Sequence, residues 1–280
     1  MNLYTIHAGY LKLDGGAMFG VVPKALWNKQ YPADDNNMIP LAMRLLLVEE
    51  GDRKILINSG IGNKQSEKFF SHFHLHGDHT IDKSLAEHGF SRDDITDVFH
   101  THLHFDHCGG TIIYDENENL LPAFPNATLW VTQNQWDWAN NPNEREAASF
   151  LKENILPMQE NGKLKIISGD TTVMPGFKVK EFDGHTIGQA IPFIDYNGQT
   201  LVFTSDLLAF SNHIRLPWIM SFDIQPLVTL KEKKAFLKEA VENDYVLFFE
   251  HDKYVECGRL KQTEKGIRLS STFTLEELKK

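Results

Sequence analysis

The sequence contains little cysteine and no long run of apolar residues. Cys108 and Cys257 are the two cysteines among 280 residues, too few for a disulfide framework, so we expect both to be reduced. No apolar segment is long enough to span a bilayer, and residues 1–7 show no basic segment followed by an apolar core. These absences predict a cytoplasmic protein that has neither a signal peptide nor a membrane partner.

Basic charge is also scarce. The chain has 28 lysines and arginines against 38 aspartates and glutamates, and the resulting net charge of -10 disfavours a nucleic-acid partner. The composition is otherwise that of an ordinary soluble globular protein, with 41% hydrophobic and 24% charged residues. Strand-like and helical segments alternate without a recognisable linker, so we expect a single domain that spans residues 1–280.

One segment concentrates potential metal ligands. The run His102-Leu103-His104-Phe105-Asp106-His107 contains imidazole and carboxylate groups, which are the donors that hold catalytic zinc and similar divalent ions. Residues 95–101 before it read as a short buried strand, and Gly109 and Gly110 follow it closely. Because α/β proteins build sites where strands end, the pattern predicts a metal site at the edge of a sheet. A purely structural role for all of these ligands is disfavoured.

Three further potential ligands follow strand-like runs downstream. They are His185 after residues 177–182, Asp206 after residues 200–204 and His251 after residues 245–249. Taken alone, His185 could also be a turn or capping histidine, and Asp206 could be the N-cap of a following helix. The assignment of His251 depends most on the resemblance described next.

The ligands and their order resemble the metallo-β-lactamase-fold hydrolase superfamily, over roughly residues 40–255. The resemblance implies an α/β fold, a four-layer αββα sandwich, with two zinc or other divalent metal ions at one edge of its sheets. It assigns His102, His104 and His185 to one ion. It assigns Asp106, His107 and His251 to the other ion, and it makes Asp206 the bridge between the two.

The same resemblance implies hydrolysis by a hydroxide that bridges the two ions. Asp106 would orient this hydroxide and pass its proton to the leaving group. Position 104 is His where oxygen-reducing diiron relatives carry Glu, which disfavours a redox reaction. Position 206 is Asp where typical zinc β-lactamases carry Cys, and His107 is a ligand that those enzymes lack. Hydrolysis by a dinuclear metal site is therefore favoured over antibiotic resistance as the native task.

The segment after Asp206 bears on the substrate. Residues 207–217, followed by 218–223, resemble N-acyl-homoserine lactonases, which quench quorum sensing, and methyl parathion hydrolases. Many lactonases carry Tyr at the position of Ala209, so a hydrogen-bond donor is missing here. His213 is our candidate catalytic replacement, with a surface or supporting role as the alternative. We expect a small-molecule lactone as substrate, foremost an N-acyl-homoserine lactone. The alternatives are an organophosphate, as in methyl parathion hydrolases, another ester, or an inactive metal-binding protein on the same scaffold. A homodimer is left open.

Two other segments qualify this interpretation. Asn58-Ser59-Gly60 stands where relatives commonly carry Asp-Thr-Gly, so Asn58 can supply a hydrogen bond to the site but no charge.

The run from His74 to His79 repeats the ligand motif letter for letter, but no strand leads into it, and residues 82–88 read as a helix that ends at Gly89. We predict a solvated or site-rimming loop there, with adventitious binding of transition metals left open.

The remaining pattern predicts further strands and helices. Strands are expected over residues 3–13, 41–48, 54–58, 127–132, 163–167 and 191–194. Helices are expected over residues 133–139, 144–154 and 229–243. Residues 17–27 are apolar without a clean period, which favours a loop over the core, a lid on an apolar pocket or a dimer contact.

Overall fold

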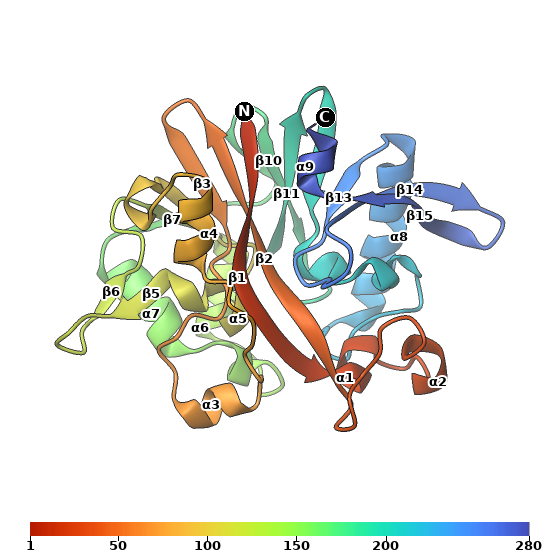
Figure 1. The fold of residues 1–280 in the computed structure, drawn as a ribbon, viewed down its shortest axis with the longest axis horizontal. Coiled ribbons are helices and arrows are strands. Elements are labelled where there is room, and N and C mark those ends of the chain that lie inside the picture. The colour runs from red at the N-terminus through yellow and green to blue at the C-terminus, as the bar shows by residue number, and fades with distance from the viewer. Residues whose placement is uncertain (280) are drawn as a thin grey trace. The chain divides into compact units, whose positions relative to one another are not determined.

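The computed structural model describes residues 1–279 and contains two main sheets (Figure 1). The first sheet has the strand order β1 (Asn2–Asp14), β2 (Met38–Glu50), β3 (Arg53–Ile57), β4 (Asp97–Phe99), β7 (Thr128–Thr132) and β8 (Leu164–Ile167). The second sheet has the order β15 (Gly266–Phe273), β14 (Cys257–Thr263), β13 (Val246–Phe248), β12 (Gln199–Phe203), β11 (Gln189–Tyr196), β10 (Phe177–Phe182) and β9 (Thr171–Met174). A small hairpin joins β5 (Ile112–Tyr114) to β6 (Leu120–Pro122).

The helices are mostly short. They are α1 (Gly15–Phe19), α2 (Lys24–Trp27), α3 (Glu67–Ser71), α4 (Ile81–Glu87), α5 (Phe105–Cys108), α6 (Gln133–Asn140), α7 (Lys152–Glu160), α8 (Pro226–Glu242) and α9 (Leu275–Leu278). Within residues 1–279, they are accompanied by the 3₁₀ turns η1 (Arg92–Asp94), η2 (Gly109–Thr111), η3 (Ala147–Ser149), η4 (Ser205–Leu208) and η5 (Ser211–Ile214). None of the described helices is long and apolar enough to cross a membrane.

The chain divides into two compact units. The first comprises Met1–Tyr10, Met43–Gly169 and Gly188–Ala190, and the second comprises Leu11–Ala42, Asp170–Ile187 and the chain from Ile191 onward. Because both units are assembled from several chain segments, neither corresponds to one continuous half of the sequence. The expectation of a single domain over residues 1–280 stays a prediction.

The core of the first unit surrounds β4. This strand pairs in parallel with β3 on one side and with β7 on the other, and all its residues are buried. Val98 packs with Leu56 and Leu129 in one apolar cluster, as expected for a parallel strand covered on both faces. Asp97, at the start of β4, is neutralised by Arg53 at 2.7 Å and accepts a hydrogen bond from Trp130. The strand therefore holds the following ligand loop on a rigid support.

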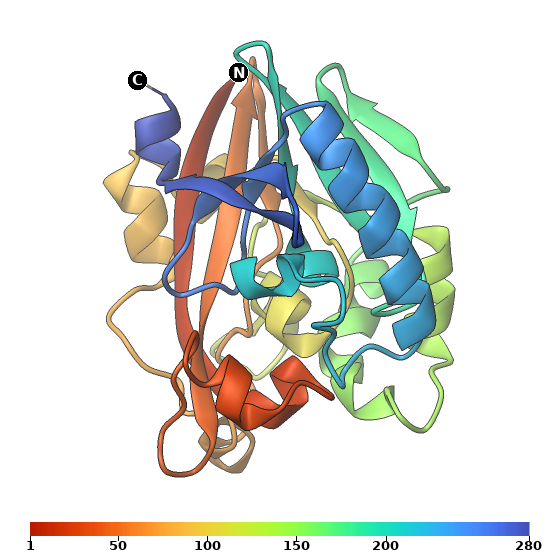
Figure 2. The same cartoon turned by 90° about the vertical axis from the view of Figure 1, so that its right-hand side faces the viewer.

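The second unit is built around β12, β13 and α8. Strands β12 and β13 pair in parallel. Helix α8 contacts the β14–β15 hairpin, and in Figure 2 the long blue helix lies beside the dark blue strands. The predicted helix over residues 229–243 is confirmed, because α8 buries Phe236, Leu237 and Ala240 at helical spacing. Pro226 starts α8 at a position where a helix needs no backbone N–H.

Most strand and helix predictions are confirmed to within a few residues, but the helix over residues 144–154 is wrong. The chain forms η3 there, and α7 begins only at Lys152. The physical reason is the side chain of Glu146, which is buried and accepts a hydrogen bond from Trp138 at 2.6 Å. A continuous amphipathic helix would have kept this carboxylate on its polar face. Strand β9 and the β14–β15 hairpin were also not predicted.

Residues 17–27 are more ordered than the predicted loop. They form the end of α1 and α2, and the rings of Phe19 and Trp27 stack at 5.1 Å. A side chain at Gly15 would place its Cβ 2.4 Å from the Trp27 ring, so only glycine permits this packing. Both cysteines are buried, and no disulfide joins them in the described part of the chain.

Candidate metal centre

In the first unit, the ligand loop leaves β4 and turns through α5. The peptide of Gly109 lies so close to the neighbouring turn that a Cβ there would be 2.1 Å from the carbonyl oxygen of Ile61. A Cβ on Gly110 would be equally close to the carbonyl oxygen of Ser59. The two glycines therefore allow the backbone approach that presses α5, with Asp106 and His107, against residues 59–61.

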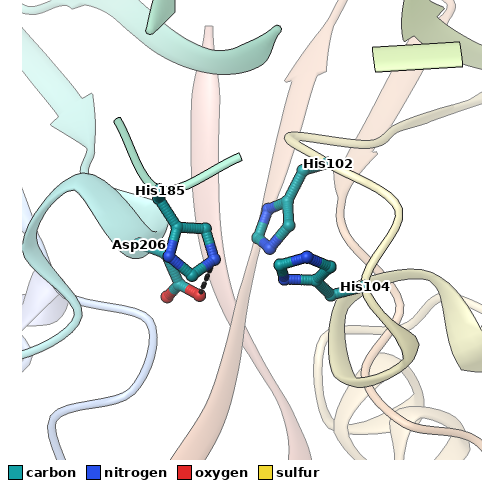
Figure 3. A group of neighbouring side chains, drawn as sticks. All are labelled: His102, His104, His185 and Asp206. Carbon is teal, nitrogen blue, oxygen red and sulfur yellow. Dashed lines mark ion pairs between the residues drawn. The ribbon is translucent and has the colours of Figure 1, made fainter. Parts of the chain in front are cut away.

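His102 and His104 lie together at the start of this loop, with ring centres 4.5 Å apart (Figure 3). Nε2 of His104 lies 2.7 Å from a carboxylate oxygen of Glu146, and Trp138 donates to the other oxygen of that carboxylate. Because the carboxylate accepts the Nε2 proton, Nδ1 of His104 keeps its lone pair for a metal ion. Nδ1 of His102 lies 3.1 Å from the hydroxyl of Thr101, which places Nε2 in the ligand position.

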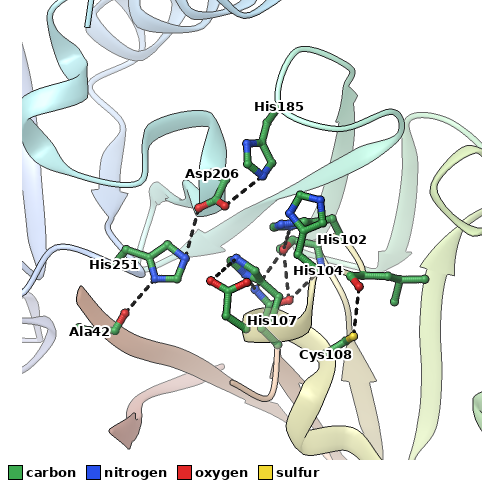
Figure 4. A network of polar contacts seen from close by, with 12 residues as sticks. Ala42, His102, His104, His107, Cys108, His185, Asp206 and His251 are labelled. Carbon is green, nitrogen blue, oxygen red and sulfur yellow. Dashed lines mark hydrogen bonds and ion pairs between the residues drawn. The ribbon is translucent and has the colours of Figure 1, made fainter. Parts of the chain in front are cut away.

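In the second unit, His185 and His251 both face Asp206. Nδ1 of His185 is held by Asp223 at 2.9 Å, and its Nε2 lies 3.1 Å from Asp206 (Figure 3). Nδ1 of His251 is held by the carbonyl of Ala42 at 2.9 Å, and its Nε2 lies 3.3 Å from Asp206 (Figure 4). Since the outer protons point at acceptors, the inner nitrogens turn lone pairs toward a carboxylate. A proton or a cation must lie between such groups, so the donors fit a metal ion.

The raised pKa of His185 also indicates that positive charge is favoured beside these carboxylates. Burial by itself would lower the pKa of this imidazole, but the carboxylates of Asp206 and Asp223 outweigh burial and raise the pKa to about 10. A divalent cation would compensate the charge of Asp206 as the Nε2 proton does, and it would displace that proton on binding, while Asp223 would keep the Nδ1 proton.

Local backbone geometry fixes His185 and Asp206. Gly184 packs against the first turn of α8, where its Cβ would lie 2.5 Å from the backbone nitrogen of Thr229. Ser205 has φ of +43°, which bends the chain sharply between β12 and η4. Asp206 lies inside η4, whose N-cap is Thr204, so the alternative of a helix N-cap at Asp206 is wrong.

Asn58 lies behind His107, as a supporting residue should. Its side-chain nitrogen is 3.1 Å from Nδ1 of His107, and its oxygen accepts from the backbone N–H of Thr101 at 2.9 Å. Nε2 of His107 lies 3.6 Å from Asp106. The hydrogen-bonding role expected for Asn58 is therefore present in the first unit.

His213 is buried in η5 with both ring nitrogens engaged. Nε2 donates to the carbonyl of Met18 at 2.9 Å, and Nδ1 accepts from the backbone N–H of Phe210 at 3.3 Å. Burial lowers the pKa of this imidazole to about 3, so it stays neutral. The geometry favours a positioning role that ties α1 to η5, and direct contact of His213 with substrate stays a prediction.

The second copy of the motif forms an exposed loop. His74 has φ of +45°, and His76 stacks on Tyr10 at 5.5 Å, where the two residues form an isolated β-bridge. In the part of the chain that the structure describes, residues 74–79 belong to neither group of possible metal ligands. The predicted solvated loop is confirmed, and α4 follows it as expected.

The sequence reasoning missed two buried carboxylates that orient the ligands. Glu146 is separated from His104 by 42 residues, and Asp223 is separated from His185 by 38 residues. No local pattern connects such distant partners. The available signal was weak: Asp223 directly follows Phe222 in an apolar segment, where a buried carboxylate requires a polar partner, and nothing in the sequence around Glu146 marks it as buried.

Comparison with known proteins agrees with this geometry. Residues 45–251 match the family model of the metallo-beta-lactamase superfamily. An N-acyl homoserine lactonase of Bacillus thuringiensis is 28% identical over 265 residues, which cover 90% of this chain and 93% of the relative. A lactonase of Bacillus cereus is 25% identical over 268 residues, with 92% and 95% covered.

Solved structures show the same fold. A probable metal-dependent hydrolase from Staphylococcus aureus superposes with a TM-score of 0.88 at 30% identity, covering 98% of this chain and 97% of its own. AidC, described as a dizinc quorum-quenching lactonase in complex with a product N-hexanoyl-L-homoserine, superposes with a TM-score of 0.78 at 24% identity, with 97% and 95% covered. The predicted α/β sandwich fold class is thereby confirmed.

The protein is an enzyme of the hydrolase class, related to N-acyl homoserine lactonases. Its His and Asp groups support the binding of divalent metal ions, and structures of its neighbours with a small-molecule product bound support a small-molecule substrate. Because the family model covers most of the sequence and the fold agrees over nearly all of it, the chain belongs to the metallo-β-lactamase superfamily.

Proposed function

We propose that this protein is a dinuclear zinc hydrolase that opens the ester ring of an N-acyl-homoserine lactone. His102, His104 and His185 would hold one ion, and Asp106, His107 and His251 would hold the other, with Asp206 bridging them. The naming of the curated relatives as N-acyl homoserine lactonases supports the substrate class. Its partner would be a small-molecule substrate, with neither nucleic acid nor membrane, and a homodimer is left open.

The observation that carries the proposal is the arrangement of His185 and His251 around Asp206. Both Nε2 atoms lie within 3.3 Å of opposite oxygens of one carboxylate, and both Nδ1 atoms are fixed from behind. A carboxylate that presents each of its oxygens to a different imidazole is suited to bridge two ions. Rigid support of this kind reduces the reorganisation that metal binding would otherwise require.

The residues divide the work of hydrolysis. When bound, two divalent ions supply Lewis acidity and lower the pKa of a water molecule toward neutrality. Asp106 is buried beside His107, and its carboxylate would orient the attacking water and carry a proton to the leaving alkoxide. Asp223 and Glu146 would keep His185 and His104 in the tautomers that present a lone pair.

A rate comparison tests the substrate. Zinc-loaded protein is assayed with hexanoyl- and decanoyl-homoserine lactone and, in parallel, with an aryl dimethyl phosphorothioate. We expect a higher kcat/KM for the lactones, because lactone opening needs one polarised carbonyl and one stabilised alkoxide. Faster cleavage of the phosphorothioate, or intact lactone, would reverse the assignment.

A phosphotriester is the second candidate substrate, because position 209 carries Ala and lacks the hydroxyl that many lactonases have there. This residue is buried and has no hydroxyl, although many lactonases place a Tyr hydroxyl at this position. The His213→Ala variant tests whether the imidazole replaces that donor, with the neighbouring Asn212→Ala variant as control. A selective fall of lactone turnover in folded His213→Ala protein would support the replacement, whereas an unchanged rate would remove His213 from the reaction.

A further inference from the structure

The ligand imidazoles differ in the group that contacts their outer nitrogen, the ring nitrogen that faces away from the proposed metal ion. For three imidazoles this group is a hydrogen-bond acceptor. Glu146 lies 2.7 Å from His104, Asp223 lies 2.9 Å from His185, and the carbonyl of Ala42 lies 2.9 Å from His251. His107 is different, because its Nδ1 lies 3.1 Å from the side-chain nitrogen of Asn58, which is a donor. An imidazole that accepts at one nitrogen carries its proton on the other when it is neutral.

Thr101 fixes the orientation of the Asn58 amide. The Asn58 oxygen accepts from the backbone N–H of Thr101 at 2.9 Å. The Thr101 hydroxyl lies 3.1 Å from that oxygen and 3.0 Å from the amide nitrogen, so it suits either orientation, and the backbone N–H alone sets the direction of the amide. A flipped amide would turn its NH₂ group against that backbone N–H, and both residues are completely buried. Two buried donors that face each other would leave both without an acceptor, so the amide nitrogen must face His107.

This amide orientation determines whether Nε2 of His107, the atom that would bind a metal ion, carries a proton. With Nδ1 accepting from Asn58, the proton of the neutral ring resides on Nε2. The Asp106 carboxylate lies 3.6 Å from Nε2, too far for a hydrogen bond but close enough for its negative charge to favour a proton there. A protonated nitrogen has no lone pair for a metal ion. For Nε2 to become a ligand, the proton would have to move to Nδ1, where it would meet the amide donor of Asn58.

We propose that Asn58 holds His107 in the Nε2–H tautomer and thereby weakens one of the two metal positions, so that the protein binds its second ion much more loosely than its first. The inference rests on the proposed dinuclear site. Asn58 acts here as a positioning residue. A carboxylate in its place would accept both from Thr101 and from Nδ1–H of His107, which would leave Nε2 of His107 as a ligand.

The direct test changes the amide to a carboxylate. Asn58 has φ of +63°, a conformation that Asp also tolerates, so Asn58→Asp preserves the turn. Wild-type and variant proteins are equilibrated against zinc buffers of increasing free Zn²⁺, and zinc per chain is measured by elemental analysis. We expect two loading steps about 10–100-fold apart in wild type, with the second step shifted to lower free Zn²⁺ in Asn58→Asp.

Two variants make the comparison specific. Asn58→Gly removes the donor and suits the positive φ, so its second step should shift in the same direction even if Asn58→Asp folds poorly. Glu146→Gln makes the opposite change, because it replaces a carboxylate behind a ligand with an amide. The single amide oxygen cannot accept from both His104 and Trp138. This variant should weaken zinc binding by about 10–100-fold at the position that uses His104, as expected when an outer partner of a ligand is lost.

A spectroscopic readout follows the proton itself. Ring ¹⁵N shifts of His107 are recorded in protein that holds only its first zinc ion, and we expect Nε2–H in wild type and Nδ1–H in Asn58→Asp. Single-step loading of two ions in wild type, unchanged in Asn58→Asp, would overturn the inference and leave the dinuclear site intact. Failure of both proteins to bind zinc would instead refute the proposed function together with the inference.

Discussion

At the scale of single residues, the hydrogen-bond partner behind each imidazole decides which nitrogen is offered to a metal ion. Glu146 and Asp223 are each at most 3% exposed and contact His104 and His185 directly. Burying a carboxylate is costly unless it is paired, so these two acidic groups would not persist inside the protein without such partners. The ligands are therefore specified together with the groups that orient them.

Asp206 gives the sharpest prediction for a single residue. Asp206→Ala removes the carboxylate that faces both His185 and His251, so zinc content should fall and kcat should drop by at least about 100-fold, the upper end for loss of a group that only supports a ligand. Elemental analysis and lactone turnover measure the two effects. Asp195→Ala, at an exposed position of β11, is the control. Full activity of Asp206→Ala would contradict the bridging assignment.

At the scale of elements, each ligand follows the end of a strand, and close backbone packing sets its position. Gly184 joins β10 to His185 while touching the backbone of α8 at Thr229. Strand β4 carries the first ligand loop between two parallel neighbours. Strands and helices of this kind hold side chains more precisely than free loops do.

Gly184→Ala tests this packing. The added Cβ would lie 2.5 Å from backbone atoms of α8, which cannot withdraw as a flexible side chain would. We expect destabilisation of about 1–3 kcal/mol, together with weaker zinc binding as His185 shifts. Thermal unfolding and zinc titration provide the measurements, with Lys178→Ala at an exposed position of β10 as control. Wild-type values for both quantities would show that the contact does not position His185.

The two copies of the ligand motif provide a comparison between elements. His76→Ala combined with Asp78→Ala alters the exposed loop and should leave the zinc content and activity unchanged. The same pair of changes at His104 and Asp106, on the loop that follows β4, should empty the site. Zinc analysis of both double variants decides between the copies. Loss of zinc from the first double variant alone would mean that the wrong copy has been assigned.

At the scale of the whole molecule, buried neutral histidines predict acid lability. Burial lowers the pKa of His7 and His100 to about 4 and that of His213 to about 3, whereas the unfolded chain takes up these protons near pH 6.5. Unfolding therefore binds protons between these values, and stability falls as the pH decreases from about 6.5 toward 4. Each such proton contributes at most about 1.4 kcal/mol per pH unit.

In metal-free protein, His185 changes the folding stability with pH in the opposite direction to the buried neutral histidines. Its raised pKa of about 10 gives stability that is present below pH 6.5 and lost as the pH rises toward 10. Urea unfolding of chelated protein across pH 4–9 should therefore show maximal stability near pH 6.5. His213→Phe, which keeps an aromatic ring between Phe19 and Phe210, should flatten the acidic side. An identical acid profile in that variant would refute the assignment of a buried neutral imidazole.

The sequence by itself determined the ligand types, their order and the strands that precede them, because alternation and helical periodicity are local properties. His102, His104, Asp106 and His107 could be separated from the repeat at residues 74–79 by the strand-like run before them. The spacing of the apolar residues in α8 likewise predicted that helix from the sequence. The resemblance then supplied the fold class, which the comparisons confirm.

Only the tertiary structure decided which side chains orient those ligands. The contacts of Glu146 with His104 and of Asn58 with His107 join residues 42 and 49 positions apart, and no local pattern encodes them. The same long-range pairing broke the helix expected over residues 144–154, because satisfying a buried carboxylate outweighs the small helical propensity of a few residues. Hydrogen-bond direction at a buried imidazole depends on partners brought together by folding, and the tautomer of His107 is therefore a property of the fold.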